Sequence, residues 1–289
     1  MIGETMFDGE IHRVRANGID FAYIEHGTGP LVIFLHGFPD NAFTWTWQMH
    51  RFAEAGYRAV APFLRGYAPS SAPMDGAYDP RTLGTDVAAL IDALSPDGRA
   101  HVVGMDWGGT ATHAALVTHP DRIKAAVVLN TAHPYSVLHG VKDPELVQRL
   151  FHFWFFQSES ADWAVPIEGL PMVDHLWRTW SPNFQDSDHI AGVKRTLAAP
   201  DGIKNALAYY RALWRAHRDG AVPVGATAVP TLSLFGETDF TTKYAGEEAP
   251  GFSGPYERTI LPAAGHFPHL EAPETVAGLI LEWFRRHHD

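Results

Sequence analysis

The chain has 289 residues, 46% of them hydrophobic and 19% charged, which is enough to bury the core of one large domain, or of one domain with an insertion. Its net charge of −11 argues against nucleic acid or an anionic membrane as a partner. The chain has no cysteine, which excludes disulfides, thiol catalysis and thiolate metal sites. No apolar run approaches the roughly 18 residues of a membrane span, and the acidic first residues do not resemble a signal peptide. We therefore expect a cytoplasmic protein.

Segments with strand and helix character alternate over the first part of the chain. An opening hairpin is expected from residues 11–15 and 19–25, joined by Asn17-Gly18, a pair typical of a type I′ turn. Residues 31–35 are all apolar, as in a strand that is buried on both faces. Further strands are expected at 57–62, 100–104 and 123–129, and helices at 45–55, 79–94 and 110–117. This alternation predicts a parallel sheet with right-handed crossovers.

The pattern changes after residue 132. Residues 133–222 contain no strand-like run and are rich in aromatic residues within helical stretches. Strand and helix character then resumes, with strands expected at 231–235 and 256–261 and a last helix at 273–287. We predict a core of residues 1–132 and 223–289 with a helical lid, residues 133–222, inserted between two strands. Such a lid would wall a ligand cavity at the carboxyl edge of the sheet, unless its aromatic residues build only its own core.

The sequence Gly104-Met105-Asp106-Trp107-Gly108 lies between an expected strand and an expected helix. A turn this sharp strains the backbone of its apex residue, and glycines on both sides allow the strand and the helix to pack closely. The pattern matches the nucleophile elbow G-x-S-x-G with Asp106 in place of serine. A carboxylate suits displacement at a saturated carbon, which leaves an alkyl ester on the enzyme. Cleaving that ester requires a base, an acid behind it and an oxyanion hole.

Two acidic residues follow the expected strand at 231–235. Glu237 and Asp239 both qualify by position as the acid, and we favour Asp239 because the second acid of such a turn is usually the inward one. Asn130 stands at the end of an earlier strand, where an alternative third member could lie, but it is not an acid.

The candidate base follows the last expected strand. His266 lies there in a glycine-flanked loop before the final helix, and His269 is the alternative base. The order Asp106, Asp239, His266 is the nucleophile, acid and histidine order of the α/β-hydrolase layout.

The oxyanion hole needs two backbone N–H groups. One is expected from Trp107, which follows the nucleophile at the start of a helix. The other is expected from Phe38, in the loop after the strand at 31–35. Pro39 has no N–H and stiffens this loop, and a cis Phe38–Pro39 bond is one expectation.

In these pieces the chain resembles the α/β-hydrolase-fold epoxide hydrolases that have an aspartate nucleophile. The matching pieces follow the family's order over nearly the whole chain. They are His36-Gly37-Phe38-Pro39 with Trp45, Leu64-Arg65-Gly66-Tyr67, Gly104-Met105-Asp106-Trp107-Gly108-Gly109, Leu129-Asn130-Thr131, Glu237-Thr238-Asp239-Phe240 and Gly265-His266-Phe267. The resemblance implies the α/β-hydrolase fold, a mostly parallel eight-stranded sheet with flanking helices and a helical lid after strand 6. It also implies a triad of Asp106, His266 and Asp239.

The resemblance further implies lid groups that donate hydrogen bonds to the epoxide oxygen, usually two tyrosines. Tyr210, just before Arg211, matches one of these positions. His152 stands where the common pattern has the other tyrosine, and the pair resembles a subclass of the family that uses a histidine and a tyrosine. The candidate substrate-contacting aromatic residues are Phe153, Trp45 and Tyr209.

Haloalkane and haloacetate dehalogenases are similar to the chain in the same places and are the main alternative. They would use the same Asp-His-Asp triad, with His152 and Tyr210 as halide ligands. Haloacetate dehalogenases carry arginines just after the nucleophile, where this chain has Trp107 and Thr110. Haloalkane dehalogenases often have Asn after His-Gly, where this chain has Phe38. These differences favour an epoxide hydrolase over the dehalogenases, although the indole N–H of Trp107 would also suit a halide. Another hydrolase remains an alternative, and the triad argues against a non-catalytic receptor or binding protein.

The resemblance thus implies a hydrolase acting on ether bonds that needs neither a metal nor an organic cofactor. Asp106 would open the epoxide, and His266, oriented by Asp239, would activate water to cleave the ester and release a vicinal diol. The expected substrate is a small apolar epoxide, and the protein would be a monomer or a homodimer. His36 and Asp40 are expected to support the loop that carries Phe38.

Overall fold

The computed structural model describes residues 10–134, 136, 142–184 and 186–288. Within these residues, eight strands form one sheet in the order β1-β2-β4-β3-β5-β6-β7-β8. β2 is antiparallel to β1 and β4, and the remaining pairs are parallel. The strands are β1 (His12–Ala16), β2 (Ile19–His26), β3 (Leu31–Leu35), β4 (Arg58–Pro62), β5 (Ala100–Met105), β6 (Ile123–Leu129), β7 (Thr231–Gly236) and β8 (Tyr256–Leu261). The predicted fold class, a mostly parallel eight-stranded sheet, is confirmed.

The central strands are buried on both faces because helices cover the sheet on both sides. Every residue of β3, β5 and β7 is buried, whereas β8, at the edge of the sheet, is half-buried or exposed at every residue except Leu261. Apolar runs therefore located the central strands accurately: β3, and β6 with Lys124 as its one polar residue, have the expected bounds. The more polar edge strand β8 also has the expected bounds. The expected turn at Asn17-Gly18 is also confirmed, since both residues have positive φ angles, 42° and 77°.

The helices begin and end close to the positions expected from the sequence. Asp79 caps α2 by accepting the N–H of Thr82 at 3.1 Å, and Pro80 occupies the first helical position. The helices are α1 (Thr46–Glu54), α2 (Pro80–Leu94), α3 (Trp107–Thr118), α5 (Pro144–Arg149), α6 (Phe151–Phe155), α7 (Ala161–Ala164), α8 (Pro171–Trp180), α9 (Ser187–Leu197), α10 (Gly202–Arg218), α11 (Pro268–Glu271) and α12 (Pro273–Arg286). Short 3-10 helices occur at Ala42–Trp45, Pro120–Arg122, Thr242–Glu247 and Ala249–Gly251.

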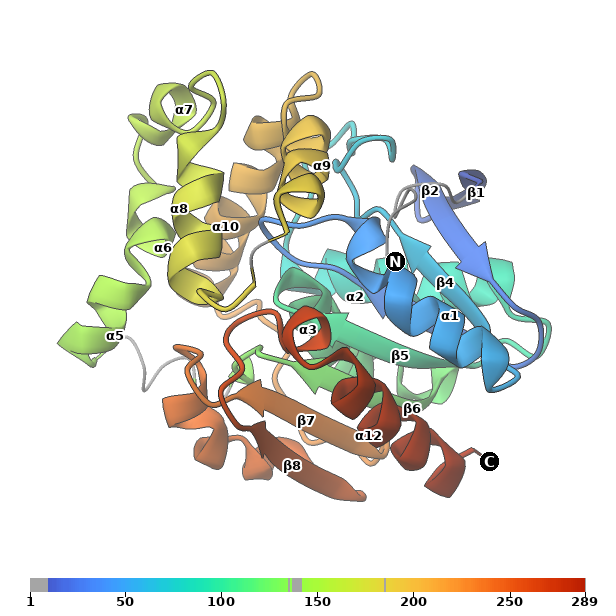
Figure 1. Ribbon diagram of the computed structural model, residues 1–289. Helices are drawn as coiled ribbons and strands as arrows, with labels where there is room; N and C mark the ends of the chain where they lie inside the picture. Colours follow the sequence, from blue (N-terminus) through green and yellow to red (C-terminus); the bar gives the residue numbers. More distant parts are fainter. Residues whose placement is uncertain (1–9, 135, 137–141, 185, 289) are drawn as a thin grey trace.

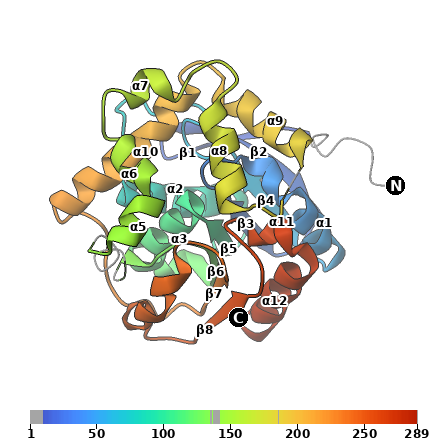
Figure 2. The same cartoon turned by 60° about the vertical axis from the view of Figure 1, so that its left-hand side comes forward.

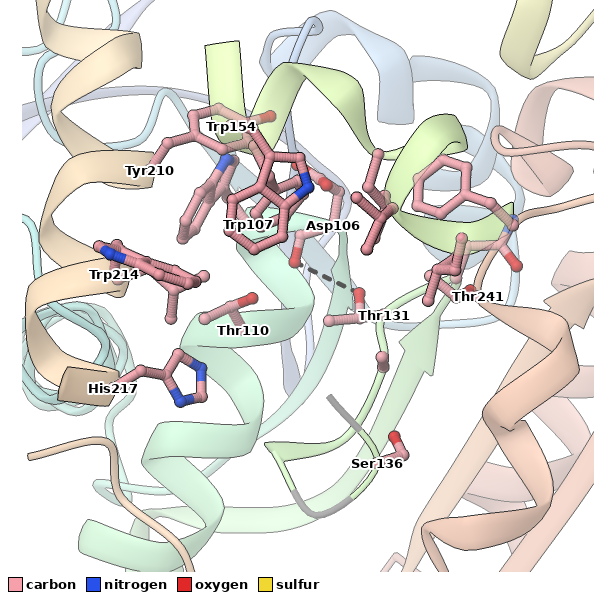
Figure 3. Close-up of a pocket in the computed structure, with 18 of the residues that line it drawn as sticks. Asp106, Trp107, Thr110, Thr131, Ser136, Trp154, Tyr210, Trp214, His217 and Thr241 are labelled. Atoms are coloured by element: carbon pink, nitrogen blue, oxygen red, sulfur yellow. Dashed lines mark hydrogen bonds between the residues drawn. The ribbon is translucent and has the colours of Figure 1, made fainter. Parts of the chain in front are cut away.

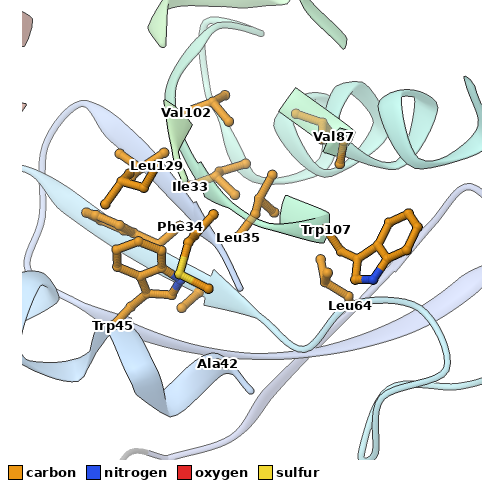
Figure 4. Close-up of a cluster of buried hydrophobic side chains, with 14 of the residues drawn as sticks. Ile33, Phe34, Leu35, Ala42, Trp45, Leu64, Val87, Val102, Trp107 and Leu129 are labelled. Atoms are coloured by element: carbon orange, nitrogen blue, oxygen red, sulfur yellow. The ribbon is translucent and has the colours of Figure 1, made fainter. Parts of the chain in front are cut away.

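The core lies between the sheet and two pairs of helices. α1 and α12 pack together on one face, and α2 and α3 pack together on the other (Figure 1). Phe34 of β3 meets the ring of Trp45 on the first face, with ring centroids 5.3 Å apart. Ile33 points the other way, toward Val87 of α2 (Figure 4). This alternation along β3 joins the two layers into one core.

Helices α5 to α10 stand between β6 and β7 in the sequence. Residues 142–184 and 186–222 contain these helices and no strand, as the aromatic, helical pattern predicted. They gather on one side of the molecule, beyond the carboxyl ends of the parallel strands (Figures 1 and 2). Over the ranges that the structure describes, no helix is long and apolar enough to cross a membrane.

Candidate active site

Asp106 lies at the apex of a tight turn between β5 and α3. Its backbone has φ 51° and ψ −115°, a conformation that non-glycine residues rarely adopt. The flanking glycines are required by close packing: a Cβ on Gly104 would lie 2.3 Å from the carbonyl oxygen of Gly108, and a Cβ on Gly108 would lie 2.2 Å from that of Leu35. The strand and the helix therefore approach each other directly behind Asp106, which projects its carboxylate from the end of the sheet.

One oxygen of the Asp106 carboxylate is held by the loop after β3. The backbone N–H of Phe38 donates to Oδ1 at 2.7 Å, and the Phe38–Pro39 peptide bond is cis. Burial raises the pKa of Asp106 to about 6, while His266 and the N–H groups of Phe38 and Trp107 stabilise the charged form. The two N–H groups that the sequence assigned to an oxyanion hole thus both act on this carboxylate.

His266 lies beside Asp106 and is held from behind by Asp239. Its Nδ1 lies 2.6 Å from Oδ2 of Asp239, and its Nε2 lies 3.9 Å from Oδ2 of Asp106. Asp239 is itself fixed, because its Oδ1 accepts the N–H of Thr241 at 2.8 Å and also the Thr241 hydroxyl. Burial is the largest single effect and lowers the pKa of His266, but the charge and hydrogen bond of Asp239, together with the charges of Asp106 and Glu271, raise the pKa above its ordinary value.

The alternatives that the sequence left open lie elsewhere. Glu237 is exposed and accepts the N–H of Ala263 at 2.9 Å. His269 is buried against Trp45, with ring centroids 4.2 Å apart, and its Nε2 bonds to the Thr44 hydroxyl at 2.7 Å. Neither side chain is bonded to the carboxylate of the elbow, so the structure brings together the favoured set of nucleophile, base and acid.

Asn130 holds the loop of His266 by its backbone and does not bond to the imidazole ring. Its Nδ2 donates to the carbonyl oxygens of Gly265 and His266 at 2.7 and 2.9 Å. Its Oδ1 accepts the N–H of Gly236 at 2.8 Å. The side chain therefore ties the end of β6 to the end of β7 and to the loop of the base.

Tyr210 of α10 packs against His152 of α6, and Tyr210 also lines the cavity onto Asp106 described below, whose lining does not include His152. Their ring centroids are 5.6 Å apart, and the Tyr210 ring also packs edge-on against Trp107 at 4.9 Å. Among the described residues, the buried Tyr210 hydroxyl and His152 Nδ1 have no hydrogen-bond partner. Burial lowers the pKa of His152 to about 3 and raises that of Tyr210 well above its ordinary value. Both groups are therefore neutral at physiological pH and available as hydrogen-bond donors.

A cavity of about 420 Å³ opens onto Asp106 (Figure 3). Most of its wall is apolar and aromatic, as is usual for a pocket that binds a small organic molecule. The aromatic part of the wall comprises Trp107, Phe153, Trp154, Tyr210, Trp214 and Phe240. Phe153 thus lies where a substrate-contacting residue is expected.

Two of the three candidate substrate-contacting residues do not line this cavity. Trp45 is fully buried between Phe34 and His269, beneath the sheet edge. Tyr209 points away from the cavity and donates its hydroxyl to the carbonyl oxygen of Arg65 at 2.8 Å. Their packing assigns both side chains to the support of the site, which corrects the expectation from the sequence.

Several wall residues were not singled out from the sequence as parts of the site. On α10 they are Leu213, Trp214, His217 and Arg218, which follow Tyr210 at intervals of three, four, seven and eight residues. This is the spacing of one helix face, so the assignment of Tyr210 could have identified them. Trp154 of α6 completes this part of the wall, with its ring centroid 5.0 Å from that of Trp214. In the described part of the chain, no three His, Asp or Glu side chains are grouped as metal ligands.

Comparisons with known proteins agree with this geometry. Residues 30–273 match the family model of the alpha/beta hydrolase fold. The chain belongs to the α/β-hydrolase fold family. It is 32% identical to an epoxide hydrolase of Caballeronia sordidicola, over 94% of this chain and 92% of that protein. It is 30% identical to epoxide hydrolase 3 of Xenopus tropicalis, over 94% of this chain and 77% of that one.

Solved structures of epoxide hydrolases are also similar to this chain. A putative epoxide hydrolase from Klebsiella pneumoniae superimposes with a TM-score of 0.82 at 25% identity, covering 96% of this chain and 97% of that one. The epoxide hydrolase VrEH1 of Vigna radiata also gives a TM-score of 0.82 at 25% identity, covering 98% and 100% of the two chains. The predicted resemblance to the epoxide hydrolases of this family is confirmed.

Proposed function

We propose that this α/β-hydrolase converts an epoxide to a vicinal diol through a covalent alkyl ester on Asp106. The observation that supports this most directly is the pairing of a carboxylate nucleophile with a buried, unpartnered Tyr210 hydroxyl across one apolar cavity. A carboxylate attacks saturated carbon, and the opening ring leaves an alkoxide that needs a hydrogen-bond donor. The relatives that bear the name epoxide hydrolase support the same reaction.

In the first half of the reaction, Asp106 opens the ring. Because Phe38 holds Oδ1, the free oxygen Oδ2 attacks the less hindered epoxide carbon. The carbon–oxygen bond of the ring breaks, and its electron pair goes to the epoxide oxygen. The hydroxyl of Tyr210 and an N–H of neutral His152 stabilise this oxygen, and Tyr210 gives it a proton and is left as the phenolate.

In the second half, water cleaves the ester. His266 takes a proton from the water, whose oxygen attacks Cγ of Asp106. The negative charge that develops on Oδ1 is stabilised by the N–H groups of Phe38 and Trp107. The intermediate then collapses: the bond between Cγ and the alkyl oxygen breaks, this oxygen takes the proton from His266, and the diol leaves. The second proton of the water returns to Tyr210, which restores both the carboxylate and the tyrosine. Asp239 holds the His266 ring in the tautomer that this proton transfer requires.

The substrate class follows from the cavity. A volume of about 420 Å³ with mostly apolar walls suits a small apolar or aromatic epoxide, and residues 133–222 act as the lid that supplies the donors to its oxygen. The aromatic walls favour aryl-substituted substrates, because their rings can pack edge-on against those of Trp154 and Trp214.

A paired turnover assay tests the proposal. One arm follows diol formation from styrene oxide, and the other follows halide release from haloalkanes and haloacetate. Asp106→Ala serves as the inactive variant, and Asp121→Ala, which removes an exposed carboxylate after α3, serves as the matched control. Diol formation that is lost only in Asp106→Ala is the expected result. Halide release without diol would instead show that the enzyme is a dehalogenase. The hydrogen-bond donors of His152 and Tyr210 would then be halide ligands.

A further inference from the structure

Two loops that are distant in the sequence must be held together for the ester to be cleaved. One loop supplies the N–H of Phe38, and the other supplies the base, His266. Helix α8, from the segment between β6 and β7, bonds to both of them. On the first loop, the indole Nε1 of Trp177 donates to the carbonyl oxygen of Pro39 at 3.0 Å. Trp177 is fully buried, so this bond is shielded from water.

The same end of α8 holds the loop of the base. The Trp177 ring stacks on Phe267, the neighbour of His266, with ring centroids 3.8 Å apart and planes 12° apart. One turn later, the carbonyl oxygen of Trp180 accepts the N–H of His266 at 2.9 Å, and Oγ of Ser181 accepts that of Phe267 at 3.0 Å. Trp177 therefore contacts the oxyanion loop with its N–H and the base loop with its ring.

A second bond ties the oxyanion loop to the neighbouring helix α9. Nε2 of His189 lies 3.0 Å from Oδ1 of Asp40, and both side chains are at most 1% exposed. The same carboxylate oxygen accepts the N–H of Asn41 at 2.8 Å. The Asn41 side chain in turn donates to the Thr196 hydroxyl of α9 at 3.0 Å. The residues that directly follow Phe38 are thus fixed from the helical segment at three points.

We propose that Trp177 is a positioning residue for ester hydrolysis, which sets the Phe38 N–H relative to His266, and that His189 assists it through Asp40. The inference rests on the proposed epoxide hydrolysis. Ring opening uses Oδ2 of Asp106 and the Tyr210 hydroxyl, neither of which is bonded to Trp177. The Phe38 N–H only holds Oδ1 in this step, while negative charge leaves the carboxylate. Hydrolysis depends on both loops at once, because charge appears on Oδ1 at the moment when His266 accepts a proton. Loss of the contacts that Trp177 makes with the two loops therefore slows ester hydrolysis selectively.

The test separates the two half-reactions in Trp177→Phe. Phenylalanine keeps a ring that can stack on Phe267 and removes only the N–H donor. Rapid quenching and intact-mass measurement give the rate at which styrene oxide alkylates the protein and the rate at which the ester decays. Because loss of an oxyanion donor costs a factor of about 10² to 10³, we expect displacement of one to slow ester decay about tenfold, with alkylation changed less than about twofold. The alkyl-enzyme then accumulates at steady state.

Trp283→Phe is the matched control, since Trp283 is a buried tryptophan on α12 whose Nε1 has no hydrogen-bond partner among the described residues. A general loss of stability would lower the active fraction and leave the ratio of the two rates unchanged. The inference is overturned if the ratio of ester decay to alkylation in Trp177→Phe equals that in Trp283→Phe and in the wild type. It is also overturned if only alkylation becomes slower.

A second pair of variants tests the inference if Trp177→Phe does not fold. His189→Phe removes the donor to Asp40, whereas His189→Gln keeps an N–H in a similar place. We expect ester decay to be slower in His189→Phe and to return toward the wild-type rate in His189→Gln. Equal decay rates in both variants and the wild type contradict this expectation. A wild-type protein that forms no diol from epoxides would contradict the proposed function itself and the inference with it.

Discussion

Nε2 of His266 lies 3.9 Å from Oδ2 of Asp106, which is too far for a direct hydrogen bond. The atom is buried and has no partner among the described residues, whereas Nδ1 of the same ring is bound to Asp239 at 2.6 Å. The ring therefore faces the carboxylate without neutralising it. This arrangement suits a base that acts on water beside Cγ of Asp106, after Asp106 has already reacted.

Replacing His266 with glutamine should trap the ester. Asp106, Tyr210 and His152 remain, so alkylation proceeds, but no base activates the water. We expect steady-state turnover to fall at least about 10³-fold and the protein mass to increase by the mass of one substrate molecule. Intact-mass spectrometry after incubation with epoxide measures both the adduct and its lifetime.

His50→Gln, at an exposed position on α1, is the control for this experiment and should turn over without an adduct. A His266→Gln protein with wild-type turnover would show that another group is the base. Loss of turnover without any adduct would instead assign His266 to the ring-opening step.

Replacing Asp239 with asparagine should change the pH dependence of ester decay. Burial lowers the pKa of His266, but the charge and hydrogen bond of Asp239, with smaller contributions from the charges of Asp106 and Glu271, together raise the folded pKa above its ordinary value. The base acts in its neutral form, and decay of the wild-type ester is therefore lost as the pH falls through this raised pKa. In Asp239→Asn the main cause of the increase is absent, so the acid limb should move to lower pH while the plateau falls by roughly 10³-fold.

The decay of a preformed ester is the right measurement here because Asp106, whose own pKa is about 6, cannot titrate while it is esterified. Glu237→Gln is the matched control, since Glu237 bonds to the backbone of Ala263 and not to the base. An acid limb that stays at the wild-type pH in Asp239→Asn would contradict the assignment of Asp239.

The sequence predicted the fold and the elbow well for a physical reason. β3 is a continuous apolar run, β6 is apolar except for Lys124, and a polar residue follows each strand, so burial on both faces is visible in the chain. The elbow is largely local, because the strain at Asp106 and the contact of Gly104 with Gly108 arise within one turn, although Gly108 also meets Leu35 of β3. Such features depend on neighbours in the sequence.

The lining of the cavity could be predicted only in part, because it depends on which face of a helix meets the sheet. Tyr209 and Tyr210 are adjacent on α10, and successive helical residues point about 100° apart. Tyr210 therefore faces Asp106 while Tyr209 bonds to the backbone of Arg65. Trp45 was misassigned for a similar reason, since its ring packs against Phe34 and His269 below the site. The bond of Trp177 to Pro39 joins segments that no sequence pattern relates.

Replacing Tyr210 with phenylalanine should slow ring opening and leave ester decay unchanged. The ring keeps its edge-on contacts with Phe38, Trp107 and Phe156, so only the hydroxyl is lost. An unstabilised alkoxide in an apolar cavity is costly, and we expect alkylation to slow by about 10²-fold. Single-turnover alkylation of the wild type and the variant measures this effect.

Tyr209→Phe is the matched control on the same helix, because its hydroxyl bonds to the backbone of Arg65 outside the cavity. Its alkylation rate should stay within about twofold of the wild type, as expected for a hydroxyl that does not contact the substrate. An equal effect of both substitutions would show that loss of packing, and not loss of a donor, slows the reaction.

Replacing Glu248 with glutamine should make the protein more stable in alkali. The side chain is 1% exposed, its Oε1 accepts the Tyr256 hydroxyl at 2.5 Å, and burial raises its pKa to about 7. Since the folded pKa lies above the unfolded one, the stability that the protonated form contributes is complete below about pH 4.5 and is lost as the pH rises through about 7. Glutamine cannot ionise and still accepts the Tyr256 hydroxyl.

We therefore expect Glu248→Gln to raise the free energy of unfolding by about 2 kcal/mol at pH 9 and by little at pH 5. Denaturant unfolding at both pH values tests this, with Glu282→Gln, at an exposed position on α12, as the control. A gain that is the same at both pH values would mean that glutamine acts by its packing and not by its lack of charge.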